Sequence, residues 1–175
     1  QINGIVMSRD WLMIGVNFVV FLLLQVFICN AIYLGIYLNI QIYLMFILFL
    51  PVSLSRSLVL LLSAIMGFSV DLLSGDLGLH TAACTAMGYV RPHLLKRITT
   101  TTTTAGQIEI PPLNRTHFGQ YYIYTGTLIL LHHLLLFTLE TFELQEILFI
   151  MSRTVVSASF NIFLISAAYK LRSKI

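Results

Sequence analysis

Six apolar segments, each about as long as a bilayer is thick, follow one another along this chain between residues 11 and 171. A helix needs about 20 mostly apolar residues to cross the hydrocarbon core of a membrane. The composition agrees, because 58% of the 175 residues are hydrophobic and only 10% are charged, which leaves too little polar surface for a water-soluble domain. The sequence therefore predicts an all-α integral membrane protein with six transmembrane helices. The predicted spans are Trp11–Cys29, Tyr33–Leu50, Leu58–Leu73, Leu79–Leu95, Tyr121–Leu139 and Ile147–Leu171.

The second of these segments is interrupted by Asn39 and Gln41 before Pro51 ends it. The stretch Leu38–Leu50 alone is short for a span. We therefore expect this segment either to cross the bilayer with a tilt or to lie partly in the interface.

One membrane domain is expected, covering residues 7–175. Residues 1–6 precede Met7, which reads as a natural start, so we expect them to derive from cloning or from a misassigned start. The first apolar run is too long for a signal peptide and lacks a small-residue cleavage site, so it is expected to be a retained helix. The longest connection, residues 96–120, is expected to be a cytoplasmic loop. Its run Thr99–Thr104 is expected to be a tether, with an extended strand as the alternative.

Basic residues predict the orientation, because cytoplasmic loops carry an excess of Lys and Arg. With the N-terminus inside, nine of the ten basic residues fall on the cytoplasmic side and only Arg153 falls outside. A five-helix arrangement would put the basic tail opposite the basic central loop. The sequence thus predicts six crossings with both termini in the cytoplasm. The nine inner residues are Arg9, Arg56, Arg91, Lys96, Arg97, Arg115, Lys170, Arg172 and Lys174.

Asp71 is the most informative polar residue, since a carboxylate in an apolar span is costly unless it is paired or faces water. It shares a helix face with Gly67 and Gly75, and small residues on one face let two helices approach closely. We expect Asp71 to be a buried structural anchor without a role in proton transfer. The alternatives are that it contacts a ligand, or that it reaches the outer interface and caps the following turn. Its expected partners are the N–H groups of the Gly75–Gly78 turn, His80, Thr81 and Arg153.

Small residues spaced four apart open the next segment, and this pattern predicts tight packing against the preceding helix. The pairs are Thr81 with Thr85, Ala82 with Ala86, and Cys84 with Gly88. Arg91 follows near the cytoplasmic end of the segment. We expect it to be a snorkelling anchor whose charge lies in the interface.

His132 and His133 lie midway along the fifth segment and point about 100° apart, so they cannot both line one narrow site. His133 shares a stripe with Phe137 and Glu140, a pattern that invites a metal or proton-relay interpretation. An HExxH motif and a third ligand are missing, so we expect no metal and an interhelical hydrogen bond from one histidine. Glu140 begins an acidic turn that is either solvated or a docking point. The residues expected to make polar or partner contacts are His80, Arg91, His133, Glu140 and Arg153.

Catalytic motifs are absent from the sequence, which has no nucleophile elbow, P-loop or paired catalytic motif. Cys29 and Cys84 lie in apolar stretches without metal-ligand spacing. No basic face or aromatic-basic module favours nucleic-acid binding. We expect neither enzymatic activity nor a cofactor. An intramembrane enzyme is kept as an alternative functional class.

The stretch from residue 67 to residue 83 resembles the signature of the rod shape-determining protein MreD family. That signature is a helix ending G-[LF]-x-x-D-x-x-S, then a short glycine-bearing turn and a small-residue helix. The size of the chain, its basic inner side and Pro51 also fit. One departure is the distance from Asp71 to Gly78, which is one position shorter than in the common pattern. The matching residues are Gly67, Phe68, Asp71, Leu72, Leu73, Ser74, Gly75, Gly78, Leu79, His80, Ala82 and Ala83.

The resemblance implies a non-enzymatic scaffold of the bacterial cell-wall elongation machinery, in the inner membrane. Such proteins bind the bitopic protein MreC and act beside MreB, RodA and a penicillin-binding transpeptidase; self-association stays open. The fold is similar to the substrate-binding S-components of energy-coupling-factor vitamin transporters, which supplies the alternative function. The short outer connections, about Asn30–Ala31, Gly75–Gly78 and Glu140–Glu146, offer few polar groups to orient a ligand and count against that alternative.

Overall fold

Helices make up the regular structure of this computed structural model, which describes residues 8–32, 35–76, 78–99, 118–141 and 146–172. No strand occurs in these ranges, so the predicted all-α class is confirmed. The predicted tether lies outside the described residues except for Thr99, and so do residues 1–6. The elements are α1 (Ser8–Leu23), its π-helical continuation η1 (Leu24–Cys29), α2 (Leu44–Leu48), α3 (Arg56–Ser74), α4 (Leu79–Thr99), α5 (Phe118–Thr141) and α6 (Ile147–Arg172).

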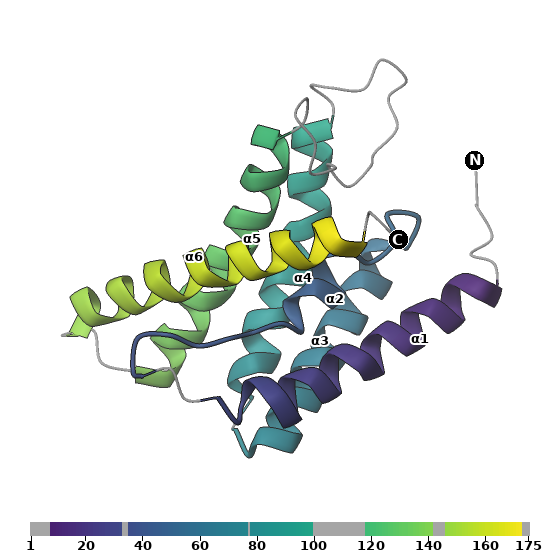
Figure 1. Cartoon of the computed structure of the whole chain (residues 1–175). Coiled ribbons are helices and arrows are strands. Elements are labelled where there is room, and N and C mark those ends of the chain that lie inside the picture. The colour runs from purple at the N-terminus through teal and green to yellow at the C-terminus, as the bar shows by residue number, and fades with distance from the viewer. Residues whose placement is uncertain (1–7, 33–34, 77, 100–117, 142–145, 173–175) are drawn as a thin grey trace.

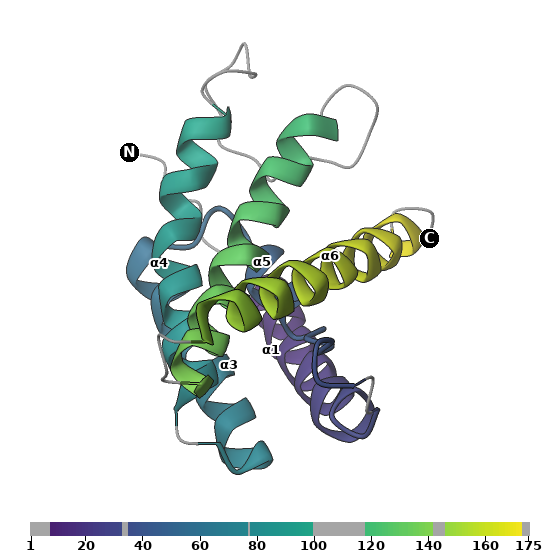
Figure 2. The same ribbon diagram turned by 90° about the vertical axis from the view of Figure 1, so that its left-hand side faces the viewer.

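The long helices after α2 pack in chain order, with α3 against α4, α4 against α5 and α5 against α6. Figure 1 and Figure 2 show α4 and α5 side by side, whereas α6 crosses α5 obliquely and α1 is inclined to both. Five of the six predicted spans coincide with these helices, with ends that shift by only a few residues.

The prediction of a second transmembrane helix is wrong, because among the described residues of that segment, 35–50, only Leu44–Leu48 is helical, as the short helix α2. All of its residues are buried, and α1, α3, α4 and α5 pack around it. A five-residue helix is far too short to cross a bilayer, which takes about 20 residues. This apolar sequence fills the centre of the protein and does not face lipid.

The segment 35–43, which precedes α2, forms neither helix nor strand and bonds to α6. Ser157 Oγ accepts a hydrogen bond from Asn39 N at 3.1 Å. Asn161 Oδ1 accepts from Gln41 N at 2.7 Å, and Asn161 Nδ2 donates to Asn39 O at 2.6 Å. Non-helical backbone at membrane depth is tolerated only where protein or water satisfies its polar groups. Two side chains of α6 satisfy these three backbone groups of the segment.

Four helical stretches in the described part of the chain are long and apolar enough to cross a membrane. Helix α4 is of similar length but less apolar, because Arg91, Pro92 and His93 fall within it. These features are compatible with a multi-pass membrane protein. The four stretches are Trp11–Cys29, Arg56–Ser74, Phe118–Thr141 and Ile147–Leu171.

Burial differs sharply between these helices. Half of the apolar stretch of α5 is buried inside the protein, against 11% of the stretch that comprises α1 and η1. Large exposed side chains such as Leu12, Phe68 and Phe163 are normal where the solvent is lipid. Helix α5 is therefore the central long helix, and α1 leaves most of its surface to lipid or to another protein.

Candidate functional site

Asp71 lies near the end of α3 with 3% of its surface exposed, and α4 donates three hydrogen bonds to its carboxylate. Oδ1 accepts from His80 N at 2.9 Å, and Oδ2 accepts from Thr81 N at 2.8 Å and Thr81 Oγ1 at 2.5 Å. The first N–H groups of a helix have no partner within that helix. Asp71 therefore caps α4 from the neighbouring helix, at the positive end of the α4 dipole. We call Asp71, His80 and Thr81 the α3–α4 clasp.

The backbone between the two helices brings these groups together. Gly75 follows α3 with φ 81°, a left-handed conformation that glycine adopts without steric cost. The N–H groups of Gly75 and Asp76 both donate to the carbonyl oxygen of Asp71, at 2.9 and 3.0 Å. Asp71 thus organises the turn through its backbone and anchors the next helix through its side chain.

Arg153, one of the predicted partners of Asp71, is engaged elsewhere. Its Nη1 forms an ion pair with Glu140 Oε2 at 3.0 Å, and its guanidinium carbon lies 4.2 Å from the centre of the Phe137 ring. This pair joins α6 to the end of α5. The prediction of an Asp71–Arg153 contact is therefore wrong, while two other predicted partners, His80 and Thr81, belong to the clasp.

Small residues allow α3 and α4 to approach closely beside the clasp. A Cβ atom on Gly67 would lie 2.5 Å from His80 O and 2.7 Å from Thr81 Cα. A Cβ atom on Gly88 would overlap the side chain of Ser63. A larger residue at either glycine would push the helices apart, as predicted for small residues at a helix contact.

Other predicted packing residues lie outside this contact. Gly75 and Gly78 have open space where a Cβ atom would be, and they serve the turn through positive φ. Ala86 is half-buried and Ala82 is exposed, so the packing prediction for Ala82 is wrong. A spacing of four positions identifies residues that share one face of α4. It does not determine which face of α4 packs against the neighbouring helix. The buried residues on this part of α4 are Ala83, Cys84, Met87 and Gly88.

A chain of hydrogen-bonding side chains runs from the surface into the core. His80 Nε2 lies 3.3 Å from Asp76 Oδ2, and His80 Nδ1 lies 2.9 Å from Tyr43 OH. The same hydroxyl lies 2.9 Å from His132 Nε2. A hydroxyl has one proton to donate, so it donates to one ring and accepts from the other. With the Nε2–H of His80 directed at Asp76, Tyr43 donates to His80 and accepts from His132, and both rings can be neutral.

His133 makes the interhelical bond that the sequence predicted for one of the two histidines. Its Nδ1 donates to Ile129 O at 2.9 Å, so its Nε2 is free to accept from Asn161 Nδ2 at 3.1 Å. Sequence reasoning missed Asn161 and its neighbour Ser157. The available signal was their spacing of four positions within an apolar span.

Arg91 is only 1% exposed, so the snorkelling prediction is wrong. Its Nε donates to Tyr124 OH at 2.9 Å, and its Nη2 donates to the carbonyl oxygens of Leu48 and Leu50. Tyr124 OH also donates to Leu48 O at 2.7 Å. The last carbonyl groups of a helix lack partners within it. Arg91 thus links α4 to the end of α2. Its guanidinium group lies inside the protein and not in the interface.

A cavity of about 300 Å³ opens at the end of the molecule that holds Asp76; we call it the Asp76 cavity. The segment 35–43, which does not form the predicted helix, lies along this cavity. The prediction that this end offers few polar groups is therefore wrong. Its described lining residues are Gln25, Cys29, Asn30, Ile32, Gly35, Leu38, Asn39, Ile40, Gln41, Ser74, Asp76, Leu79, His80, Leu136 and Glu140.

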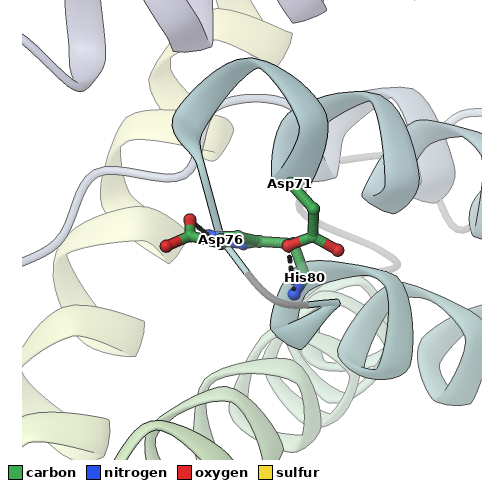
Figure 3. A group of neighbouring side chains, drawn as sticks. All are labelled: Asp71, Asp76 and His80. Carbon is green, nitrogen blue, oxygen red and sulfur yellow. Dashed lines mark hydrogen bonds and ion pairs between the residues drawn. The ribbon is translucent and has the colours of Figure 1, made fainter.

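The group Asp71, Asp76 and His80 could in principle hold a metal, since one ligand atom from each lies within 4.8 Å of the others. Figure 3 shows the His80 side chain between two carboxylates that do not turn toward a common point. The oxygens of Asp71 already accept three hydrogen bonds. Hydrogen bonding therefore accounts for this arrangement better than metal coordination.

No protein-family model, curated protein or solved structure matches this chain. A functional assignment therefore rests on the geometry of the chain itself and on the resemblance carried by residues 67–83.

Proposed function

We propose that this chain is a non-enzymatic membrane scaffold of the bacterial cell-wall elongation machinery, similar in role to the MreD family. The α3–α4 clasp carries the proposal. The stretch that resembles the MreD signature is the one that builds the clasp, and the Asp71 carboxylate has its donors within the protein. A carboxylate with three donors has little capacity left to bind a substrate. Its role is to hold two helices in a fixed relation, which is what a scaffold needs.

The proposed partner is an MreC-type bitopic protein, whose single membrane helix would pack against α1. Helix association in lipid depends on close packing, which small residues promote. Gly15 on α1 is exposed, with open space where a Cβ atom would be, so a partner backbone can approach there. The exposed apolar residues of α1 are Trp11, Leu12, Met13, Val16, Val19, Val20 and Leu23.

We also propose that the chain crosses the inner membrane six times, with both termini in the cytoplasm. Asn30 Nδ2 donates to Ser74 Oγ at 2.9 Å, so the end of η1 lies beside the end of α3. Helix α3 begins at Arg56, at its opposite end. The residues between Asn30 and Arg56 therefore traverse the molecule. In this arrangement the segment 35–43 and α2 make the second crossing without forming a long helix.

Depletion of the chain in its native rod-shaped bacterium tests the scaffold proposal. Cells should widen and stop elongating, and expression of the wild-type chain should restore a constant width. Unchanged width and elongation after depletion would overturn the proposal.

A second candidate function, a small-molecule-binding subunit similar to transporter S-components, is favoured by the Asp76 cavity. Its volume of about 300 Å³ lies at the lower end of ordinary ligand pockets, which hold about 300–1,000 Å³. Native mass spectrometry of the protein extracted from its own membrane tests this candidate. A bound small molecule supports it, and an empty protein together with a lost cell shape on depletion favours the scaffold alone.

A further inference from the structure

The Asp76 cavity contains several amide side chains that are already used by the fold. Gln25 Nε2 donates to Asn30 Oδ1 at 2.8 Å and to Ile40 O at 2.9 Å, and Gln25 Oε1 accepts from Ile42 N at 2.9 Å. Asn30 Nδ2 donates to Ser74 Oγ at 2.9 Å. These groups build the wall of the cavity, and their capacity to bind a ligand is largely consumed.

Two lining groups keep acceptor capacity. Gln41 is 2% exposed, and its Oε1 is buried without a hydrogen-bond partner among the described residues. This oxygen is covered in the structure, so a ligand N–H reaches it only when the Gln41 amide turns into the cavity. A buried acceptor without a partner costs free energy, and a donating ligand would therefore favour that turn. Asp76 contacts His80 through Oδ2, and its side chain is 38% exposed. Its carboxylate therefore still faces the cavity solvent.

The charge of the lining has one sign. Asp76 and Glu140 are its charged residues, and no Lys or Arg is among the described residues that line it. Glu140 is paired with Arg153, so Asp76 is the carboxylate available to a ligand. Ile32, Leu38, Leu79 and Leu136 add an apolar part to the wall.

We propose that the Asp76 cavity binds a small organic ammonium compound, with one protonated amine on a short carbon chain. The ammonium group donates to the Asp76 carboxylate, a further N–H of the ligand donates to Gln41 Oε1, and the carbon chain packs on the apolar wall. The inference rests on the second candidate function, because it names the ligand class of that same cavity. An anionic ligand is disfavoured, since it would meet Asp76 without a compensating cation.

Titration of the full chain in lipid nanodiscs with butylamine, 1-butanol and butyrate tests the ligand class. These probes share a carbon chain and differ in charge. Calorimetry should detect saturable binding of butylamine alone. Asp76→Asn removes the charge and should weaken butylamine binding about tenfold or more, since hydrogen bonds to charged groups are stronger than those between neutral groups. Gln41→Met removes the acceptor at similar size and should also weaken binding. Glu146→Gln, a change at an exposed carboxylate outside the cavity, should leave binding unchanged.

Several results would overturn the proposal. One is the absence of saturable butylamine binding by a monodisperse wild-type protein. Another is equal affinity for butylamine and 1-butanol, or an affinity that neither Asp76→Asn nor Gln41→Met changes. Binding of manganese or zinc chloride that Asp76→Asn abolishes, without amine binding, would assign the cavity to a metal ion. A co-purified ligand without an amine would refute the ammonium class and leave the second candidate function standing.

Discussion

Asp71 and Arg91 are both buried charges on the α3–α4 pair, and each is satisfied by groups that lack partners within a helix. Asp71 accepts from the first N–H groups of α4, whereas Arg91 donates to carbonyl groups at the end of α2. Isolated charges are costly inside a membrane protein unless they are paired or hydrogen-bonded. The sequence indicates that Asp71 needs donors but cannot indicate that Arg91 points inward, because its position near a helix end also fits snorkelling.

Replacement of Asp71 tests the clasp at the scale of a residue. Asp71→Leu leaves three donors of α4 without an acceptor and should lower stability by about 1–3 kcal/mol. Asp71→Asn keeps one acceptor oxygen and should cost less. The thermal midpoint of the purified protein in mild detergent measures both. Ser69→Ala is the matched control, because among the described residues Ser69 Oγ bonds only to Ile65 O of its own helix. Equal stability of Asp71→Leu and the control would refute the structural role. Loss of function in folded, complexed Asp71→Asn would mean that the charge itself matters.

Arg91→Lys should destabilise the protein although it keeps the charge. An ammonium group cannot reproduce the planar set of donors that reaches Tyr124 and the carbonyl groups of Leu48 and Leu50 together. The yield of monodisperse protein should fall, while Arg56→Lys, at an exposed position, should leave it unchanged. If both variants behave like wild type, Arg91 does not tie α4 to α2.

At the scale of elements, five long helices follow directly from apolar runs, and α2 does not. An apolar run such as that before Pro51 can face lipid or fill a protein core, and hydropathy alone does not separate these outcomes. Asn39 and Gln41 were the available signal that the helix is interrupted. Their partners, Ser157 and Asn161, lie 118 and 120 positions away in the sequence. Helical periodicity carries no information over such distances, so the candidate site was only partly predictable.

Asn161→Leu should release the segment 35–43 from α6. Asn161 is 1% exposed and bonds to Gln41 N, Asn39 O and His133, so the variant leaves buried polar groups unsatisfied. We expect the free energy of unfolding to fall by about 1–3 kcal/mol. Hydrogen exchange at the Gln41 amide should become faster. Asn17→Leu on α1 makes the same chemical change at a half-buried position and serves as the control. Unchanged exchange at Gln41 would contradict this account of the segment.

At the scale of the whole molecule, the proposed topology keeps the nine-to-one distribution of basic residues, although the second crossing is not a long helix. Reporter fusions after Arg97 and after Ile175 should both indicate the cytoplasm, and a fusion after Glu143 should indicate the periplasm. A periplasmic C-terminus would contradict six crossings.

We propose that the chain scaffolds a partner with a single membrane helix, and photocrosslinking followed by co-purification tests this proposal. The full chain should be extracted from its native membrane in mild detergent after site-specific photocrosslinking from Val16 or Val20 on α1, with Tyr89 on α4 as an exposed control position. We expect one stoichiometric crosslinked partner of the MreC type from α1 and none from Tyr89. Recovery of the chain alone, or the same proteins from all three positions, would contradict it.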